Sequence, residues 1–178
     1  MSFAKGTFAL GDPRAMRALA HPTRLALLDH LHNVGKATAT ECSEFVDESP
    51  SSCSYHLRSL AQWGFVEEVE GGFGRQRPWR ARATRIEFPS NGFESTVLRD
   101  EIVARQQQRV RRALSHEQEL PPRWRRAAQT SSAALALTAS ELEELGERFE
   151  DLLDEFRGRS GRRGTRQVVV SFGAVAEP

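Results

Sequence analysis

The chain has 178 residues, which is enough for one domain or for a small domain with a substantial appendage. With 39% hydrophobic and 28% charged residues, no apolar run near the roughly 18 to 20 residues of a membrane span, and no signal-peptide core, it is expected to be a cytoplasmic protein without a membrane partner. The net charge of +1 gives no global argument for a nucleic-acid partner, so such an argument has to come from the local distribution of charge.

Two helices are expected near the N-terminus. Asp12 followed by Pro13 favours a helix over residues 14–20, because aspartate caps the first free amides and proline fits the first turn. The pair His21-Pro22 interrupts this helix, and a second helix follows and ends at Gly35. Its leucines recur at helical spacing, which is typical of the core face of a small helical domain. These residues are Leu25, Leu27, Leu28 and Leu31.

A third helix is predicted over residues 41–46. Thr40 is expected to cap it, and its apolar side chains are expected to be buried. These side chains are Cys42, Phe45 and Val46. The stretch 47–49 then forms the turn into the next helix.

The segment after this turn is the most informative part of the sequence. Ser49 is suited to cap a helix that starts at Pro50, and Gly64 is suited to end it. One side of this helix is apolar, and the other presents hydrogen-bonding groups as a helix that enters a DNA major groove does. The apolar residues are Cys53, Leu57 and Leu60; the predicted DNA contacts are Ser51, Ser52, Ser54, Tyr55 and Arg58. The alternative is a solvated helix surface in a protein-interaction module.

A β-hairpin with a basic, glycine-rich tip is predicted next, with strands over residues 65–70 and 75–83. Arg75, Arg77 and Arg80 are candidate DNA contacts, although a basic loop is also the ordinary way to keep a hairpin soluble. Four helices followed by a hairpin is the order of a winged helix-turn-helix. The predicted fold class is therefore mainly α with a small β component.

We place a domain boundary near residue 90, where Pro89 to Gly92 suggests a hinge. Residues 1–90 then form the DNA-binding domain, and residues 91–178 form a dimerisation region that is also a candidate effector region. A long helix is predicted over residues 93–119. Its apolar stripe is too thin for a monomer core but suits pairing with a second copy of itself.

A small α/β unit is predicted beyond Pro121-Pro122, with short strands at residues 135–137 and 168–172 around a helix over residues 140–156. Thr138 is expected to cap this helix together with Glu141. The apolar residues that the helix is expected to bury are Leu142, Leu145, Phe149, Leu152, Leu153 and Phe156. Trp124, Phe149 and Phe172 could line a pocket for an unknown small-molecule effector; structural bracing is the alternative.

Two stretches, residues 17–25 and residues 53–60 with Gly64 to Val66 behind them, resemble the arsenic-repressor (ArsR-type) winged-helix regulators. The resemblance covers about residues 12 to 85. It implies a homodimer that binds a palindromic DNA operator, usually as a repressor, with the fourth helix reading bases and the hairpin touching the backbone or minor groove. The C-terminal part resembles the tails of a subgroup whose effectors are mostly unknown.

The metal ligands of that family are not matched. Where its cysteine-x-cysteine sensor falls, this chain has Thr38-Ala39-Thr40, and threonine is not a soft sulfur ligand. On the long helix, Asp100 is followed by Ile102 rather than by a histidine, so the pair of His116 and Glu119 has no partner. We expect no metal and no cofactor.

The remaining reactive side chains favour structural roles. Cys42 and Cys53 are expected to be small buried hydrophobes, with a redox switch as the minority alternative. Arg24 is expected to pair with an acidic neighbour or to cap a turn, and His21 and His56 to make structural hydrogen bonds. No nucleophile–base arrangement stands out, so no catalytic residue and no enzyme activity are predicted.

Overall fold

The computed structural model describes residues 7–71, 77–83, 85–89, 91–157 and 164–176. The chain divides into two compact units, Met1–Arg105 and Gln106–Pro178, and the division falls within a single long helix. None of the helices in these ranges is both long and apolar enough to cross a bilayer.

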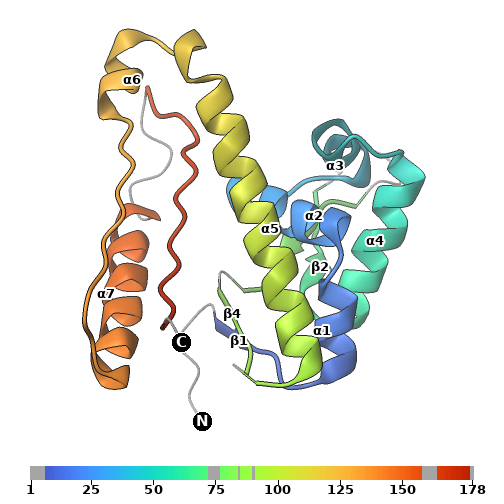
Figure 1. Cartoon of the computed structure of the whole chain (residues 1–178). Coiled ribbons are helices and arrows are strands. Elements are labelled where there is room, and N and C mark those ends of the chain that lie inside the picture. The colour runs from blue at the N-terminus through green and yellow to red at the C-terminus, as the bar shows by residue number, and fades with distance from the viewer. Residues whose placement is uncertain (1–6, 72–76, 84, 90, 158–163, 177–178) are drawn as a thin grey trace. The chain divides into compact units, whose positions relative to one another are not determined.

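Four helices lie wholly within the first unit: α1 (Pro13–Leu19), α2 (Pro22–Val34), α3 (Ala39–Val46) and α4 (Pro50–Gln62) (Figure 1). Local capping explains where they begin. The Asp12 carboxylate accepts a hydrogen bond from the backbone N–H of Arg14 at 2.8 Å, and His21 Nδ1 accepts one from Thr23 at 3.2 Å. The predicted boundaries of the first two helices are confirmed to within one residue or so.

The third helix begins earlier than predicted, and Thr40 does not cap it. Thr38 Oγ1 accepts from the Glu41 N–H at 3.2 Å, while the Glu41 carboxylate accepts from the Thr38 N–H at 2.7 Å. This reciprocal pair satisfies two free amides at once and starts α3 at Ala39. Burial of Phe45 was also wrongly predicted: its side chain is 48% exposed and stacks on His30 with ring centroids 4.4 Å apart.

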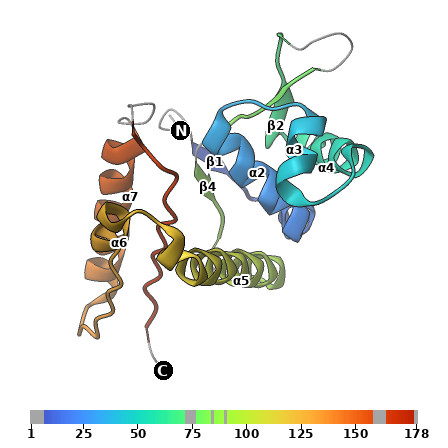
Figure 2. The ribbon, with the colours of Figure 1, turned by 90° about the horizontal axis from the view of Figure 1, so that it is seen from above.

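The predicted hairpin is present as β2 (Val66–Glu68) and β3 (Trp79–Ala81), paired antiparallel with Glu67 opposite Arg80 and Glu68 opposite Trp79. This hairpin is called the wing below. Both strands are shorter than predicted. Figure 2 shows α2, α3 and α4 together, with β2 leading away from them. The arrangement is a winged helix-turn-helix, mainly helical with a small β component, as predicted.

A second strand pair was not predicted. β1 (Thr7–Ala9) lies parallel to β4 (Arg85–Glu87), so the segment before α1 pairs with the segment after the wing. This pairing brings the two ends of the winged helix-turn-helix together.

One hydrophobic core holds the first unit together. α4 contributes Cys53, Leu57 and Leu60, all fully buried, and the wing contributes Val66 and Trp79. The long helix α5 (Phe93–Ser115) joins this core through Leu98, which is also fully buried. The first turns of α5 are therefore part of the compact unit that contains the winged helix-turn-helix.

The second unit contains the rest of α5, a 3₁₀ turn (Glu117–Glu119), a short unpredicted helix α6 (Pro122–Ala127) and α7 (Ala139–Arg157). The predicted cap of α7 is confirmed, because Thr138 Oγ1 accepts from the Glu141 N–H at 3.3 Å and the Glu141 carboxylate accepts from the Thr138 N–H at 2.7 Å.

The two predicted C-terminal strands are absent. Residues 135–137 and 168–172 are both described, and neither forms a ladder; Figure 1 draws them as tubes without arrows. Their β-branched and apolar composition favours an extended chain, but a strand also needs a hydrogen-bonded neighbour. The predicted small α/β unit is thus, in the residues described, a helix with extended segments.

The predicted burial of the apolar residues of α7 was also wrong. Leu152 and Phe156 are exposed, and the other four are only half-buried. The helix is strongly amphipathic, but the second unit is small and leaves much of the apolar face of α7 in contact with solvent.

Candidate nucleic-acid interface

Helix α4 is anchored at both ends by local hydrogen bonds. Ser49 Oγ accepts from the backbone N–H of Ser52 at 3.1 Å and lies 2.9 Å from the Ser51 hydroxyl. At the other end Gly64 adopts a φ of +78°, which lets the Phe65 N–H donate to the Leu60 carbonyl at 3.0 Å. The orientation of α4 about its own axis is then set by its apolar side in the core.

The polar side of α4 faces outward, as predicted. Tyr55 is 63% exposed, Ser51 and Arg58 are exposed, and Ser52 and Ser54 are half-buried. The hydroxyl, phenol and guanidinium groups are therefore accessible on one surface of a helix, while its opposite side is sequestered. Those are donors and acceptors of the kind that read base edges.

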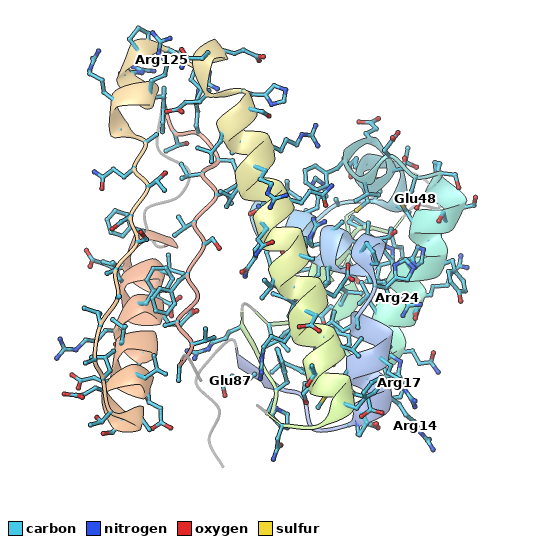
Figure 3. All side chains as sticks on the ribbon, viewed as in Figure 1. Arg14, Arg17, Arg24, Glu48, Glu87 and Arg125 are labelled. Atoms are coloured by element: carbon cyan, nitrogen blue, oxygen red, sulfur yellow. The ribbon has the colours of Figure 1, made fainter. Side chains whose placement is uncertain are left out.

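Beneath α4, a polar cluster joins it to α1 and α2 (Figure 3). The Arg24 guanidinium donates through Nη1 to the Ala18 carbonyl at the end of α1, and through Nε to His56 Nδ1 at 3.4 Å. The rings of His56 and His21 lie 4.7 Å apart. Thr23, next to them in α2, donates to Glu48 at 3.4 Å. Arg24 thus caps a helix end, and both histidines are structural hydrogen-bonders, as predicted.

The environment of the two histidines favours their neutral forms. Burial, followed by the charge of Arg24, lowers the pKa of His21, and burial followed by His21 and Arg24 lowers the pKa of His56. In each ring Nδ1 accepts a hydrogen bond, which requires that nitrogen to be unprotonated.

An open groove of about 640 Å³ lies between α4 and the wing. It brings together three of the predicted contacts on α4 with one of the predicted wing arginines. The residues that line it are Ala39, Thr40, Pro50, Ser51, Ser54, Arg58, Glu68, Arg77 and Trp79. The helix and the wing therefore present their polar groups to one shared space.

The two predicted wing contacts that lie within the described residues are on opposite faces of the hairpin. Arg77 lines the groove, 3.8 Å from the Glu68 carboxylate. Arg80 lies opposite Glu67 in the register, and its Nη2 donates to that carboxylate at 2.6 Å. Because side chains alternate along a strand, the face with Glu67 and Arg80 is turned away from the face with Glu68 and Trp79. Arg75 lies outside the described residues.

Glu67 and Glu68 were not singled out from the sequence. Glu67 also lies 3.7 Å from Arg82, and the hydrogen bond from Arg80 lowers the pKa of its carboxyl group. A signal was present: one predicted strand carries glutamates and the next carries arginines, so opposite charges could meet across the hairpin. Assigning each glutamate to a face, however, requires the register.

Both cysteines are fully buried and free in the core of the first unit. Burial raises the pKa of Cys42 to about 12, with a further contribution from Cys53, and burial also raises the pKa of Cys53. Thiols held in the protonated form react slowly, which supports the small-hydrophobe interpretation over the redox switch.

The candidate effector residues are only partly brought together. Phe149 of α7 and Phe172 stack with ring centroids 4.3 Å apart. Trp124 of α6 is half-buried, and its Nε1 is the one buried side-chain nitrogen or oxygen without a hydrogen-bond partner among the residues described. The pocket that these three residues were predicted to form remains a prediction.

Candidate metal ligands do not gather in the described part of the chain, where no group of three or more histidine, cysteine, aspartate or glutamate side chains is placed to hold an ion. His116 instead lies with Nδ1 2.9 Å from the Arg112 carbonyl, at the end of α5.

Comparison with known proteins supports the assignment of the helices. Residues 19–69, which include α2, α3, α4 and β2, match a family described as a helix-turn-helix domain, which is not an enzyme family. No curated protein matches the chain. Among solved structures, a mutant of Lactococcus lactis ZitR in its apo form is 17% identical, with 77% of this chain and 83% of that chain covered, at a TM-score of 0.33. A similarity this low carries no argument about the present chain.

Proposed function

We propose that this protein is a sequence-specific, DNA-binding transcriptional regulator that acts as a repressor. The observation that carries the proposal is the shared groove, in which the exposed polar side of α4 and the wing meet. The groove is lined by two guanidinium groups, of Arg58 and Arg77, and by one carboxylate, of Glu68. These groups leave a net positive charge at the surface where a duplex would dock. The match of residues 19–69 to a helix-turn-helix domain supports the same function.

In the proposed complex, α4 lies in the major groove of DNA. Ser54, Tyr55 and Arg58 discriminate among bases, because their donors and acceptors lie on its exposed side. Ser51 and Ser52, in the first turn of α4, contact the DNA backbone. Arg75, Arg77 and Arg80 are proposed wing contacts, with Arg77 nearest to α4.

The ArsR-type resemblance supports a homodimer on a palindromic operator, with residues 1–90 binding DNA and residues 91–178 serving dimerisation. α5 is the proposed dimer helix, because apolar side chains on it remain exposed in the single chain. These are Phe93, Val97, Val103 and Leu114. Two copies would place their α4 helices in successive major grooves about 34 Å apart.

The C-terminal unit is proposed to brace the dimer, and the stacked Phe149 and Phe172 are the candidate start of an effector pocket together with Trp124. A screen of thermal stability with small molecules tests the effector role, because a ligand that binds the folded state must raise the melting temperature.

Binding to the DNA upstream of the protein's own gene, measured by gel shift at moderate salt, tests the proposed function. Arg58→Ala should weaken specific binding by about tenfold or more and non-specific binding by less. Arg14→Ala, an exposed arginine at the start of α1 that does not line the groove, is the matched control. If no fragment shifts, or if both variants behave alike, the chain is better explained as a winged-helix protein-interaction module.

A further inference from the structure

The long helix α5 is attached to the first unit along one of its faces. Ser95, Leu98 and Ile102 recur at steps of three and four residues, which is the spacing of one side of a helix. Leu98 is fully buried in the core, and Ile102 packs against that core. The buried hydroxyl of Ser95 donates to Met16 Sδ of α1 at 3.3 Å. Arg105, three residues beyond Ile102, extends the same row.

Arg105 connects this row to Asp29 of α2. Its Nε donates to Asp29 Oδ2 at 2.8 Å, and the two side chains are only 18% and 32% exposed. A short hydrogen bond between charged groups is directional, and partial burial limits its screening. The pair of Arg17 with Glu94, at the start of α5, is looser: its atoms lie 3.9 Å apart, and the Arg17 side chain is 62% exposed. Because such an exposed pair contributes little, the pair with Asp29 holds α5 more firmly.

The place of this ion pair along α5 matters for a dimer. Arg105 is the last residue of the first unit, and α5 continues from there to Ser115 in the second unit. Phe93 and Val97, four positions apart on another face of α5, are exposed and available to a second copy. The helix thus carries both the attachment of the DNA-binding domain and the proposed dimer contact. Its direction against α2 and α4 therefore decides how far apart the two copies of α4 lie.

DNA is sensitive to that separation. One base pair more or less between two half-sites moves them by about 3.4 Å along the duplex and rotates them by about 35° about its axis. A dimer whose α5 helices are held firmly follows this change only if it breaks a contact that holds them. Since a hydrogen bond to a charged group is lost in that case, the wrong spacing is disfavoured by about tenfold.

We propose that Arg105 is a positioning residue, which through Asp29 fixes the direction of α5 against the DNA-binding domain and thereby sets the half-site spacing that the dimer accepts. This inference rests on the proposed function as a DNA-binding homodimer. The bases are read by α4, whereas the distance between the two half-sites is set by a contact on a different helix.

The test compares the full-length wild type with Arg105→Gln and with Arg17→Gln. The first variant removes the cation that meets Asp29, and the second, the matched control, removes a cation that meets Glu94 of the same helix. Binding sites are selected from random duplex DNA with the wild type. Affinities are then measured for the selected site, for versions with the half-sites one base pair closer or farther apart, and for a single half-site. Sedimentation establishes whether each protein is a dimer.

The wild type and Arg17→Gln should prefer the selected spacing by about tenfold over either altered spacing, and Arg105→Gln should lose most of this preference. Affinity for a single half-site should be the same in all three proteins, because neither Arg105 nor Asp29 lines the groove between α4 and the wing.

Four results would overturn the inference and leave DNA binding intact. They are a wild type without a spacing preference, an Arg105→Gln variant that keeps the preference or becomes monomeric, an equal loss of preference in Arg17→Gln, and weaker binding of Arg105→Gln to the single half-site. A wild-type protein that selects no sequence would instead overturn the proposed function itself.

Discussion

Leu57 lies in the middle of the apolar side of α4, where it is fully buried in the core of the first unit. Leu57→Ala removes about three methyl or methylene groups, worth about 0.8 kcal/mol each in transfer from water. Because the surrounding helices cannot close the cavity completely, the expected loss of unfolding free energy is about 3 to 5 kcal/mol. The substitution leaves every polar side chain of α4 in place.

Thermal unfolding followed by circular dichroism measures this effect. For a cooperative unit of about 100 residues, 1 kcal/mol shifts the melting temperature by about 4–8 °C, so a loss of about 3 kcal/mol lowers it by about 12–24 °C. Tyr55→Ala on the same helix is the matched control. Its side chain is 63% exposed, and the expected loss is below about 1 kcal/mol, including its edge contact with the His56 ring.

The two variants should also separate in DNA binding. Tyr55→Ala is expected to bind DNA poorly and to have a melting temperature close to that of the wild type. Leu57→Ala should bind DNA at temperatures where it is still folded, but its melting temperature should be lower. If Leu57→Ala melted within a few degrees of the wild type, or if Tyr55→Ala were equally destabilised, the orientation of α4 derived above would be wrong. The polar side of α4 would then not line the groove beside the wing.

Three further predictions concern buried thiols, histidines and a helix cap. Burial raises the pKa of Cys42 to about 12 and also raises that of Cys53. Neither cysteine should therefore be labelled by a thiol reagent in the native protein at about pH 8, while both should react in urea. Rapid labelling of the native protein would contradict this prediction. Burial lowers the pKa of His21 and His56 from the ordinary 6.5, so at pH values below 6.5 the unfolded chain binds more protons than the folded one. The urea midpoint of unfolding should therefore fall as the pH is lowered through 6.5. If a variant lacking both imidazole rings showed the same pH dependence as the wild type, these two histidines would not be its cause. Thr138→Ala removes the cap of α7 at a cost of about 1 kcal/mol, which should speed amide exchange in its first turn about fivefold, whereas Thr138→Ser should not.

Much of the helical structure could be predicted from the sequence, because helix ends and helix faces depend on neighbours within about one turn. Asp12, Ser49 and Thr138 were each expected to cap a helix, and each accepts a hydrogen bond from a free amide of the first turn. The polar side of α4 was likewise predicted from residue spacing alone.

The hairpin of β2 and β3 was predicted, but pairing between segments far apart in the chain could not be, because such a strand exists only when a distant segment meets its hydrogen-bonding edge. β1 and β4 are three residues long and nearly eighty positions apart in the chain, and nothing local marks them as partners. Residues 168–172 carry a strong strand composition but have no ladder partner in the described structure, so composition alone was misleading there.

The sequence by itself therefore determined most of the helices, although not α6, and which side of α4 is polar, since both follow from local spacing and capping. Only the tertiary structure decided what that side shares a groove with. The register of the wing turns Arg77 and Glu68 toward α4 and turns Arg80 and Glu67 away, because a strand alternates its faces with every residue. A shift of the pairing by one residue would reverse that assignment without changing a single amino acid.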